Sequence, residues 1–467
     1  MKTKACYGSA ALAALFVPFV LAAQPATPAG TVTFSKDVAP ILQRACQDCH
    51  HTNGVGPMSL VTYQEVRPWA KAIKQRILIG PHAGVMPPWF VEKDIGIQKF
   101  KGDMSLRDDE SATIVKWVDS GSPEGNPADM PNPRVFDDSG AWTIGGPDLV
   151  VKSPEVTVPA HGPDQWGDFG TIPTGLTEDR YVQAVQIREV NDTPMNQAVK
   201  TVGGRFVFHH MTYASAAPDR PSESWPIHEV GRNPDMFPPE AARLLAANSA
   251  LQLSAGHVHP NGRVTKAHLE FAFKFFPKGY QPLYKPARLN LGNGIDLDVE
   301  PNQANQQVHA YATLQENTKI IAFEPHLHAP GVRMCLEAIW GINVQTLSCV
   351  GYDHNWVHQY VYEDDAAPLL PKGTIVHLVG FLDTTAANKN LADTRNWAGG
   401  GRRSVSNMFI DLGYSVSLTD EQFNAEMAKR RASMKTRNDY DIGCPLCWAD
   451  PNVAAHLVTA PRPAAVD

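Results

Sequence analysis

The chain has 467 residues, more than one ordinary hydrophobic core holds, so we expect two or three domains. Its composition, 43% hydrophobic and 19% charged, is that of a folded globular protein and excludes a collagen, a coiled coil and a disordered chain. The formal net charge of −7 argues against a nucleic-acid partner, because such a partner selects for a basic surface. The residues that can carry chemistry are the seven cysteines and 17 histidines.

The first residues have the pattern of a secretory signal peptide. Lys2 and Lys4 precede an apolar stretch, residues 10–23, which is broken by Pro18 and ends in small residues. This stretch is too short for a membrane anchor, which takes about 20 unbroken apolar residues. We therefore expect a signal peptide over residues 1–23, a periplasmic or secreted protein, and no membrane span in the mature chain.

The next segment, residues 33–122, is expected to form a small all-α domain. Ser105–Asp108 starts an amphipathic stretch that stops at Gly121, a residue typical of helix C-termini. Residues 123–146 are rich in Pro, Asn, Asp and Gly and are expected to be a linker.

Beyond residue 146 the sequence changes to short β-branched or aromatic segments separated by turns, which is typical of sandwiches and jelly rolls. We expect two tandem all-β jelly-roll domains, residues 147–280 and 281–467, and a C-terminal helix that begins with the capping box Thr419–Gln422. The clearest expected strands are Tyr181–Ile187, Arg205–Tyr213, His268–Phe276, Val308–Leu314 and Thr374–Phe381.

Cys46, Cys49 and His50 form the C-x-x-C-H motif that attaches c-type haem. Two thiols at this spacing reach both vinyl groups, and the adjacent imidazole becomes the proximal iron ligand. A disulfide beside an incidental histidine is the alternative interpretation. The motif predicts one covalent haem c in residues 33–122, which makes this segment a cytochrome c domain.

The second axial ligand of this haem is expected to be Met86. It lies between the haem motif and the predicted helix that ends at Gly121, as in small class I cytochromes, and thioether ligation suits electron transfer. Met58 and Met104 compete with it, since a methionine is more often a core residue than a ligand. His82 is a further alternative.

Six other histidines come in three close pairs. The pairs are His209 with His210, His257 with His259, and His326 with His328. Residues i and i+2 of a strand share a face, so His326 and His328 can reach one metal. His209 and His210 point to opposite faces unless the strand ends or bulges there. With a methionine downstream, imidazole plus thioether favours copper over zinc.

Residues 146–414 resemble the type II copper, ascorbate-dependent monooxygenases, the family of peptidylglycine α-hydroxylating and dopamine β-monooxygenases. The resembling segments are Phe206–His210, Gly256–Gly262, Pro325–Gly331, Tyr352–Trp356, Pro371–Thr374 and Asn407–Met408. The N-terminal segment resembles the c-type cytochrome domain of certain bacterial members. The resembling segments there are Cys46–His50, Met86–Trp89 and Trp117–Gly121. Each motif is modest by itself, and their shared order carries the resemblance.

The resemblance implies two jelly rolls that each hold one copper across a solvent-filled cleft. The first copper, which relays an electron, is expected to bind His209, His210 and His257. The second copper, which binds oxygen and hydroxylates a C–H bond, is expected to bind His326, His328 and Met408.

Two of these ligand positions have competitors. In the family an aromatic residue usually follows the third histidine of the first site; here none does, so His259 competes with His257. The residue before the methionine is usually acidic in the bacterial members; here it is Asn407, so Met334 competes with Met408.

Four further cysteines are available for disulfides outside the cytoplasm, and three pairings are possible. Cys335 and Cys349 flank an expected hairpin that turns near Gly341, which lets them meet across it. Cys444 and Cys447 are followed by a tryptophan instead of a histidine, so we expect a structural disulfide there and no second haem.

Together these features predict an exported copper-dependent monooxygenase that hydroxylates a small organic substrate with O2. Ascorbate or a redox protein would donate electrons, and the tethered c-type haem would pass them on. One alternative is a non-catalytic periplasmic haem and copper protein that transfers electrons or binds copper. Another is a haem module joined to a structural or carbohydrate-binding sandwich.

Overall fold

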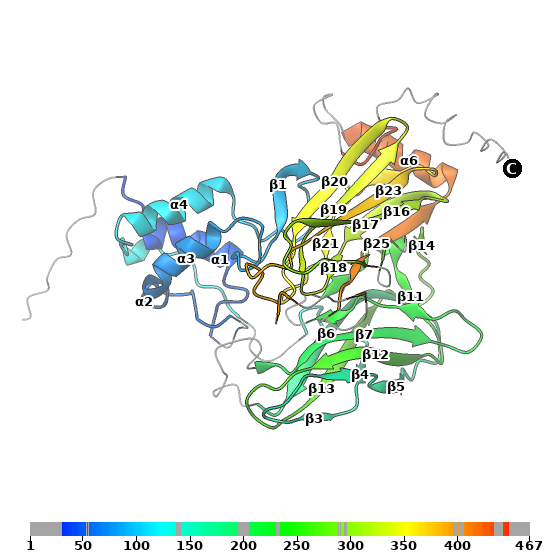
Figure 1. Ribbon diagram of the computed structural model, residues 1–467, viewed down its shortest axis with the longest axis horizontal. Coiled ribbons are helices and arrows are strands. Elements are labelled where there is room, and N and C mark those ends of the chain that lie inside the picture. Colours follow the sequence, from blue (N-terminus) through cyan, green and yellow to red (C-terminus); the bar gives the residue numbers. More distant parts are fainter. Residues whose placement is uncertain are drawn as a thin grey trace, which may run out of the picture.

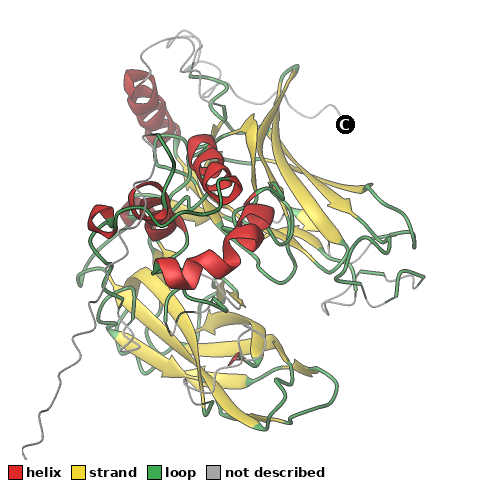
Figure 2. Ribbon diagram, turned by 90° about the vertical axis from the view of Figure 1, so that its left-hand side faces the viewer, coloured by secondary structure: helices red, strands yellow, loops and turns green. Residues whose placement is uncertain are grey.

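The computed structural model is mostly antiparallel β-sheet with few helices (Figures 1 and 2). It describes residues 30–52, 54, 56–136, 142–193, 205–229, 234–287, 289, 291–293, 297–391, 393–395, 399–400, 406–433 and 442–447. The predicted signal peptide, residues 1–23, lies outside the described residues. None of the helices described is long and apolar enough to cross a membrane.

The helices of the N-terminal segment lie to one side of the sheets (Figure 1). They are α1 (Ala39–Ala45), α2 (Tyr63–Val66), α3 (Ala70–Ile77) and α4 (Asp108–Asp119), with a π-helical turn over Phe34–Val38. Leu42 and Trp117 are fully buried in the core that these helices share. Gly121 follows α4 with a φ of +93°, the conformation that favours glycine at a helix C-terminus, as predicted.

One part of the segment predicted to be helical is a strand instead. β1 (Val91–Gly96) pairs antiparallel with β20 (Asn343–Gly351), at the edge of a sheet that is otherwise built from residues after 300. Trp89 and Phe100 lie on either side of β1 and belong to the hydrophobic core of that distant sheet. The helical prediction fails here because burial against another part of the chain outweighs local preference.

The first sandwich is formed by residues 149–275. Its strands are β2 (Leu149–Lys152), β3 (Val156–Val158), β4 (Gln165–Gly167), β5 (Gly170–Pro173), β6 (Arg180–Asn191), β7 (Phe208–Ala216), β8 (Glu223–Ser224), β9 (His228–Glu229), β10 (Asp235–Met236), β11 (Arg243–Leu245), β12 (Ala250–Val258) and β13 (Thr265–Phe275). One sheet has the order β10–β6–β13–β2, with β11 on β6 and β3 on β13. The other has the order β4–β12–β7–β8, with β5 on β12 and β9 on β7. Val185 of β6 shares one core with Phe208 of β7, so the two sheets pack face to face.

The second sandwich is formed by residues 285–418 together with β1. Its other strands are β14 (Lys285–Ala287), β15 (Gly292–Asn293), β16 (Gln306–Thr313), β17 (Asn317–Phe323), β18 (Pro325–Leu327), β19 (Gly331–Trp340), β20, β21 (Tyr360–Val361), β22 (Leu369–Leu370), β23 (Ile375–Leu382), β24 (Phe409–Asp411) and β25 (Tyr414–Leu418). The sheets are β1–β20–β19–β23–β16, β14–β25–β17–β21 with β22 on β17, and β15–β24–β18. Leu336, Phe323 and Phe409 come from the three sheets and share one core.

The five expected strands are confirmed with small shifts of their ends, since the segments overlap β6, β7, β13, β16 and β23. β7, for example, begins at Phe208 instead of Arg205. The C-terminal helix α6 (Asp420–Ser433) begins with the predicted capping box. Thr419 Oγ1 accepts the Gln422 N–H at 3.2 Å, and Gln422 Oε1 accepts the Thr419 N–H at 2.9 Å. In each case the local pattern of polar and apolar residues is sufficient to specify the element.

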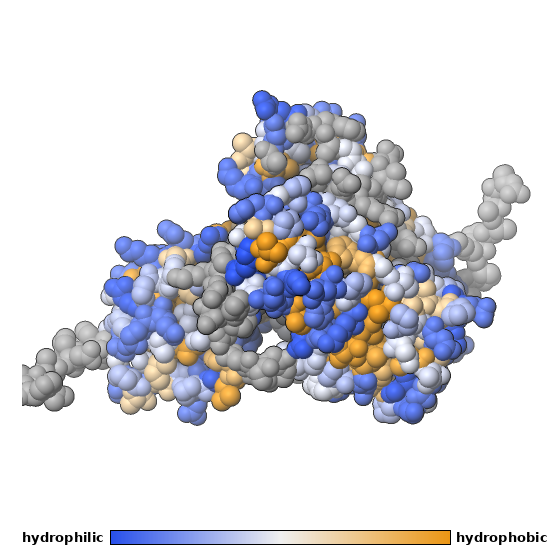
Figure 3. Space-filling model, turned by 90° about the horizontal axis from the view of Figure 1, so that it is seen from below, coloured by the Kyte–Doolittle hydropathy of each residue, from blue (hydrophilic) through white to orange (hydrophobic). Residues whose placement is uncertain are grey.

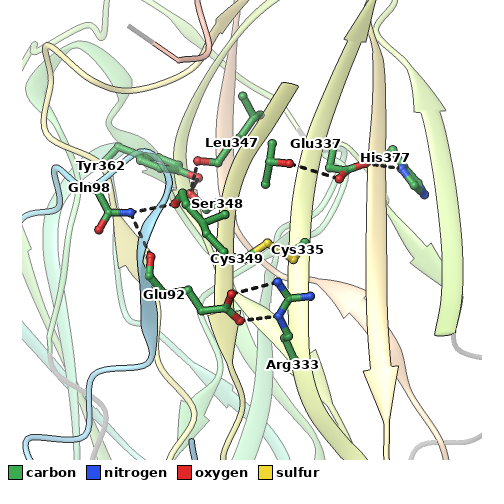
Figure 4. The surroundings of a disulfide bond; sticks show 12 residues. Glu92, Gln98, Arg333, Cys335, Glu337, Leu347, Ser348, Cys349, Tyr362 and His377 are labelled. Carbon is green, nitrogen blue, oxygen red and sulfur yellow. Dashed lines mark hydrogen bonds and ion pairs between the residues drawn. A yellow bond between two sulfur atoms is a disulfide. The ribbon is translucent and has the colours of Figure 1, made fainter. Parts of the chain in front are cut away.

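Two disulfides are formed, in one of the three pairings that the sequence leaves open. Cys335 and Cys349 lie opposite one another on β19 and β20 and are bonded (Figure 4). The hairpin turns at Gly341, whose φ of +60° favours glycine. Cys444 and Cys447 form the second disulfide.

Close packing and an ion pair hold β1 against the second sandwich. The Glu92 carboxylate accepts hydrogen bonds from the Arg333 guanidinium, including one from Nη2 at 2.9 Å (Figure 4). A side chain at Gly96 would meet the Leu347 carbonyl oxygen at 2.3 Å, so only glycine allows this approach. The N-terminal segment is therefore attached to the second sandwich by specific contacts.

The surface seen from below the first sandwich mixes hydrophilic and hydrophobic side chains. Figure 3 shows hydrophobic residues in several separate patches among hydrophilic ones. Scattered apolar residues of this kind are ordinary on the surface of globular proteins.

Trp89 gives a direct test of this attachment. It is 8% exposed and packs edge-on against Tyr360, with ring centroids 5.1 Å apart. We expect Trp89→Ala to lower the free energy of unfolding by about 3–5 kcal/mol, because it leaves a cavity in the core. Urea denaturation followed by near-ultraviolet circular dichroism measures the change.

The matched control is Trp69→Ala, at a tryptophan of the helical segment that is 44% exposed. We expect its effect to stay within about 0.5 kcal/mol. Equal losses in the two variants would contradict a core role for Trp89.

Candidate metal centres

Three histidines of the first sandwich form a compact group. His209 and His210 lie on β7, and His257 lies on the neighbouring strand β12. Their ligand atoms all lie within 4.8 Å of one another. This spacing allows the three imidazoles to bind one metal ion, and these are the three residues expected to hold the first copper.

A distortion of the sheet lets adjacent histidines join one group. The pairing of β12 with β7 is irregular between Ser254 and Val258, and Ala255 within this stretch has a φ of +47°. His257 pairs with His210 inside the irregularity. Because a bulge turns side chains away from strict alternation, residues of both faces can meet at its edge.

The surroundings of His257 fix its ring for metal binding. Its Nε2 donates to Asp164 Oδ2 at 2.8 Å, and the indole of Trp166 stacks on the ring at 3.8 Å with 8° between the planes. Since Nε2 carries the proton, the lone pair lies on Nδ1. That Nδ1 is buried and has no hydrogen-bond partner in the described part of the chain, nor has Nδ1 of His209. A buried lone pair without a proton donor, on His257, and a second unpartnered ring nitrogen beside it suit a metal ion.

The electrostatics keep these imidazoles neutral. Burial, together with the neighbouring His257 and His354, lowers the pKa of His209 to about 3. Burial and the neighbouring His209 and His257 lower the pKa of His210 to about 2. Neutral imidazole is the form that binds metals, so the group is ready to coordinate at neutral pH.

Of the two competing residues, His257 is the one grouped with His209 and His210. The ring of His259 is 6.4 Å from that of His209, against 4.9 Å for His257. Nδ1 of His259 lies 3.2 Å from the Pro260 carbonyl oxygen. The geometry therefore favours His257 as the third ligand.

The second predicted group lies where β18 meets β24. These strands pair antiparallel, with His326 opposite Ile410 and Leu327 opposite Phe409. Extended by one residue, the same register sets Met408 opposite His328. Directly opposite residues share a face, so His326, His328 and Met408 lie on one side of the ladder.

The rings of His326 and His328 are 5.5 Å apart, and the orientation of the second is fixed. Nδ1 of His328 donates to the Ser406 carbonyl oxygen at 3.0 Å, which leaves the lone pair on Nε2. Met408 is half-buried, whereas the competing Met334 is fully buried in the hydrophobic core. Met408 is thus the methionine available beside this histidine pair.

The two histidine groups face each other across the junction of the sandwiches. His326 of the second sandwich is among the charges that lower the pKa of His210 in the first. Glu229 lies opposite His210 in the pairing of β9 with β7, and its Oε1 is 3.7 Å from Nδ1 of His326. His354 of the second sandwich stacks near His209, with centroids 5.7 Å apart.

Four residues of this junction were not predicted as site residues: Asp164, Trp166, Glu229 and His354. The segment Tyr352–Trp356, which contains His354, resembles the copper family, but no sequence pattern near the other three residues points to a metal site. Asp164, for example, lies 93 residues before the histidine that it orients. Only the folded chain brings them to the ligands.

A cavity of about 890 Å³ lies between the two sandwiches. Trp225 and Arg243 line it from the first sandwich, and Ile410 and Tyr414 line it from the second. Ile410 is opposite His326 in the β18–β24 ladder, so the cavity lies against β24, the neighbour of the strand that carries His326. No histidine is among the described residues that line it.

The C-x-x-C-H motif follows α1 directly. Cys46 and Cys49 are free thiols rather than the alternative disulfide, and burial raises the pKa of Cys46 to about 12. His50 Nδ1 donates to the Met58 carbonyl oxygen at 3.1 Å, which leaves the lone pair on Nε2. A fixed ring with one available nitrogen and two free thiols fits covalent haem attachment.

The structure separates the competitors for the second haem ligand. Met104 packs against the core of the second sandwich, and Met58 packs in the helical core close to Cys46. Met86 is 40% exposed, so it is not used for core packing. His82, the further alternative, follows Pro81, whose carbonyl oxygen lies against Gly351 of the second sandwich. Its backbone is therefore next to β20.

Comparison with models of known protein families and with curated proteins finds no match. Among solved structures, the chain is similar to the cowpea mosaic virus top component, with 10% identity, a TM-score of 0.26, and coverage of 61% of this chain and 95% of that chain. It is also similar to a protein described as an α-L-fucosidase from Bacteroides ovatus, with 11% identity, a TM-score of 0.17, and coverage of 56% of this chain and 39% of that chain. Likenesses this low carry no argument about function, which therefore rests on the site itself.

Protonation of the histidine group should destabilise the metal-free protein as the pH falls. The folded-state pKa of His209, about 3, lies below the ordinary value of 6.5, so the unfolded chain takes up protons first. Stability is therefore lost progressively as the pH falls from about 6.5 towards 3. The urea midpoint, measured between about pH 7 and pH 4, should fall less in the double variant His209→Asn/His210→Asn.

His309→Asn is the control, because His309 is exposed on the outer strand β16. It should retain the wild-type pH dependence. If the double variant also retained it, burial of neutral imidazoles at this site would be refuted.

Proposed function

We propose that this protein is an exported copper-dependent monooxygenase that hydroxylates a C–H bond of a small organic molecule with O2. In this proposal the two sandwiches are the jelly rolls of the type II copper monooxygenases. Residues 33–122 are a c-type cytochrome domain through which ascorbate or a redox protein supplies electrons. The observation that carries the proposal is the juxtaposition of two imidazole groups, one from each sandwich, at their junction.

The residues at the junction suit copper. His209, His210 and His257 offer neutral imidazoles, and His326 and His328 offer two more. Met408 adds a thioether on the face of the second pair, and thioether stabilises Cu(I) whereas zinc rarely binds it. When bound, copper supplies electron transfer at the first group and oxygen activation at the second, and haem c supplies a further one-electron carrier.

Surrounding groups hold the ligands in place. Asp164 keeps the proton of His257 on Nε2, and the Ser406 carbonyl keeps the proton of His328 on Nδ1. Each contact fixes which nitrogen has its lone pair available for a metal. Trp166 covers the ring of His257 and shields it from water.

The cavity between the sandwiches supports a small organic substrate. Its volume of about 890 Å³ is in the range of small-molecule sites, which is about 300–1,000 Å³. Aromatic and aliphatic side chains line it together with charged ones, which include Arg243, Glu223 and Asp235. It lies against β24, the strand that Met408 precedes. A substrate bound there would lie one strand away from His326.

Contacts between the helical segment and the junction support an electron route. Arg205 Nη1 donates to the Gly54 carbonyl oxygen at 3.3 Å, and Gly54 lies four residues after His50. Arg205 itself precedes His209 by four residues. The haem motif and the first histidine group are thus joined by one hydrogen bond and two short stretches of chain.

The metal content of the purified mature protein tests the proposal. We expect one iron in covalent haem and one copper for each of the two histidine groups, by elemental analysis and the pyridine haemochrome spectrum. Cys46→Ala/Cys49→Ala should abolish covalent haem, because both attachment thiols are lost. It should keep both coppers, because neither cysteine belongs to a histidine group. Iron without any copper in the wild-type protein would rule the monooxygenase out.

Met408 tests the role of the second group. In copper-loaded protein, we expect oxygen to reoxidise the reduced haem faster than in copper-free protein. Met408→Ala should remove most of this acceleration, because the thioether that favours Cu(I) is lost. Stopped-flow absorbance of the haem measures the rates, and the haem spectrum itself should not change.

Met236→Ala is the matched control, at a methionine of the first sandwich that is 56% exposed. Its reoxidation rate should equal that of the wild type. A haem reoxidation rate indifferent to copper loading would refute the coupling of haem to copper.

A further inference from the structure

His354 lies between the two histidine groups and is a member of neither. It belongs to the loop that follows β20 of the second sandwich. Its ring centroid is 5.7 Å from that of His209 in the first sandwich, with 29° between the planes. The centroid is also 6.3 Å from that of His328 in the second group.

The spacing of His354 from His209 equals the widest spacing within the first histidine group. The ring centroids of His209, His210 and His257 are 4.9–5.7 Å apart, and their ligand atoms meet within 4.8 Å. The separation of His354 from His209 is at the upper end of the same range. The ligand atoms of His354 lie outside the group that meets within 4.8 Å, so ligation requires its ring to move towards His209.

The imidazole of His354 also has an unsatisfied nitrogen. Its Nδ1 is buried and has no hydrogen-bond partner among the described residues. Burying such a group costs about 1–3 kcal/mol, so its presence calls for a compensating interaction. Nδ1 of His209, the nearest ring of the first group, is in the same condition.

Hydrogen bonds shape the loop that carries His354. The Tyr352 hydroxyl donates to the Leu327 carbonyl, next to His328. Asp353 closes a turn around His354, since its Oδ1 accepts the Asn355 N–H at 3.0 Å and its carbonyl accepts the Trp356 N–H at 3.0 Å. These hydrogen bonds define the backbone turn from which the His354 side chain faces the first sandwich.

We propose that His354 is a fourth imidazole ligand of the copper held by His209, His210 and His257. The inference rests on the proposed function, because it requires copper at that group. Three ligands come from the first sandwich and the fourth from the second. Copper at this site therefore binds the two sandwiches together, and it does so beside His328 of the second group.

The test measures Cu(II) binding to the full mature chain that carries His326→Ala/His328→Ala. These two substitutions remove the second site, so that the measured copper is bound at the first. In this background, His354→Phe should weaken Cu(II) affinity on the order of 10–100-fold, at least the loss that an outer-shell partner causes. It should also change the electron paramagnetic resonance spectrum of the bound Cu(II), because one nitrogen ligand is lost. Adding free imidazole to His354→Ala should restore the spectrum.

His309→Phe, at the exposed histidine of β16, is the matched control and should leave affinity and spectrum unchanged. If His354→Phe and His354→Ala both kept the affinity and spectrum of the background protein, His354 would not be a ligand, while the three-histidine site would stand. If the background protein bound no copper at all, the proposed function itself would fail together with this inference.

Discussion

The histidines at the junction of the sandwiches are buried only because they are neutral, and the rest of the site depends on this condition. Desolvation lowers the pKa of His209 to about 3 and that of His354 to about 4. The same burial leaves ring nitrogens without proton donors, which is costly in an empty site and favourable for a ligand. Unpartnered buried nitrogens would lower the stability of an ordinary core, but here they are suited to binding a metal ion.

Holding two sandwiches in register at such a junction requires contacts away from it. The Arg243 guanidinium of the first sandwich lies 5.3 Å from the ring centroid of Tyr414 in the second. The hydroxyl of Tyr414 donates to the Ala241 carbonyl. The N-terminal segment adds to this, since Trp89 is buried in the core of the second sandwich while Arg205 of the first contacts the loop after the haem motif. Helices and both sandwiches thus meet around one region.

How much was predictable from the sequence differs between elements for a physical reason. The strands β6 and β13 carry their own alternation of apolar residues, and the capping box at Thr419 contains both of its partners within four residues. β1 has no such local signal, because its stability comes from pairing with β20, some 250 residues later. The pairing of Cys335 with Cys349 was predictable because one hairpin contains both cysteines.

The sequence by itself determined which groups are available: a C-x-x-C-H motif, three histidine pairs and a methionine near the end of the second sandwich. The tertiary structure decided which of them meet. His257 rather than His259 joins the first group because an irregular stretch of β12 sets the direction of its side chain. Asp164 and His354 come from distant strands and loops, and only long-range packing brings them to it. Residue chemistry is local, whereas coordination depends on distances between side chains that only the folded chain fixes.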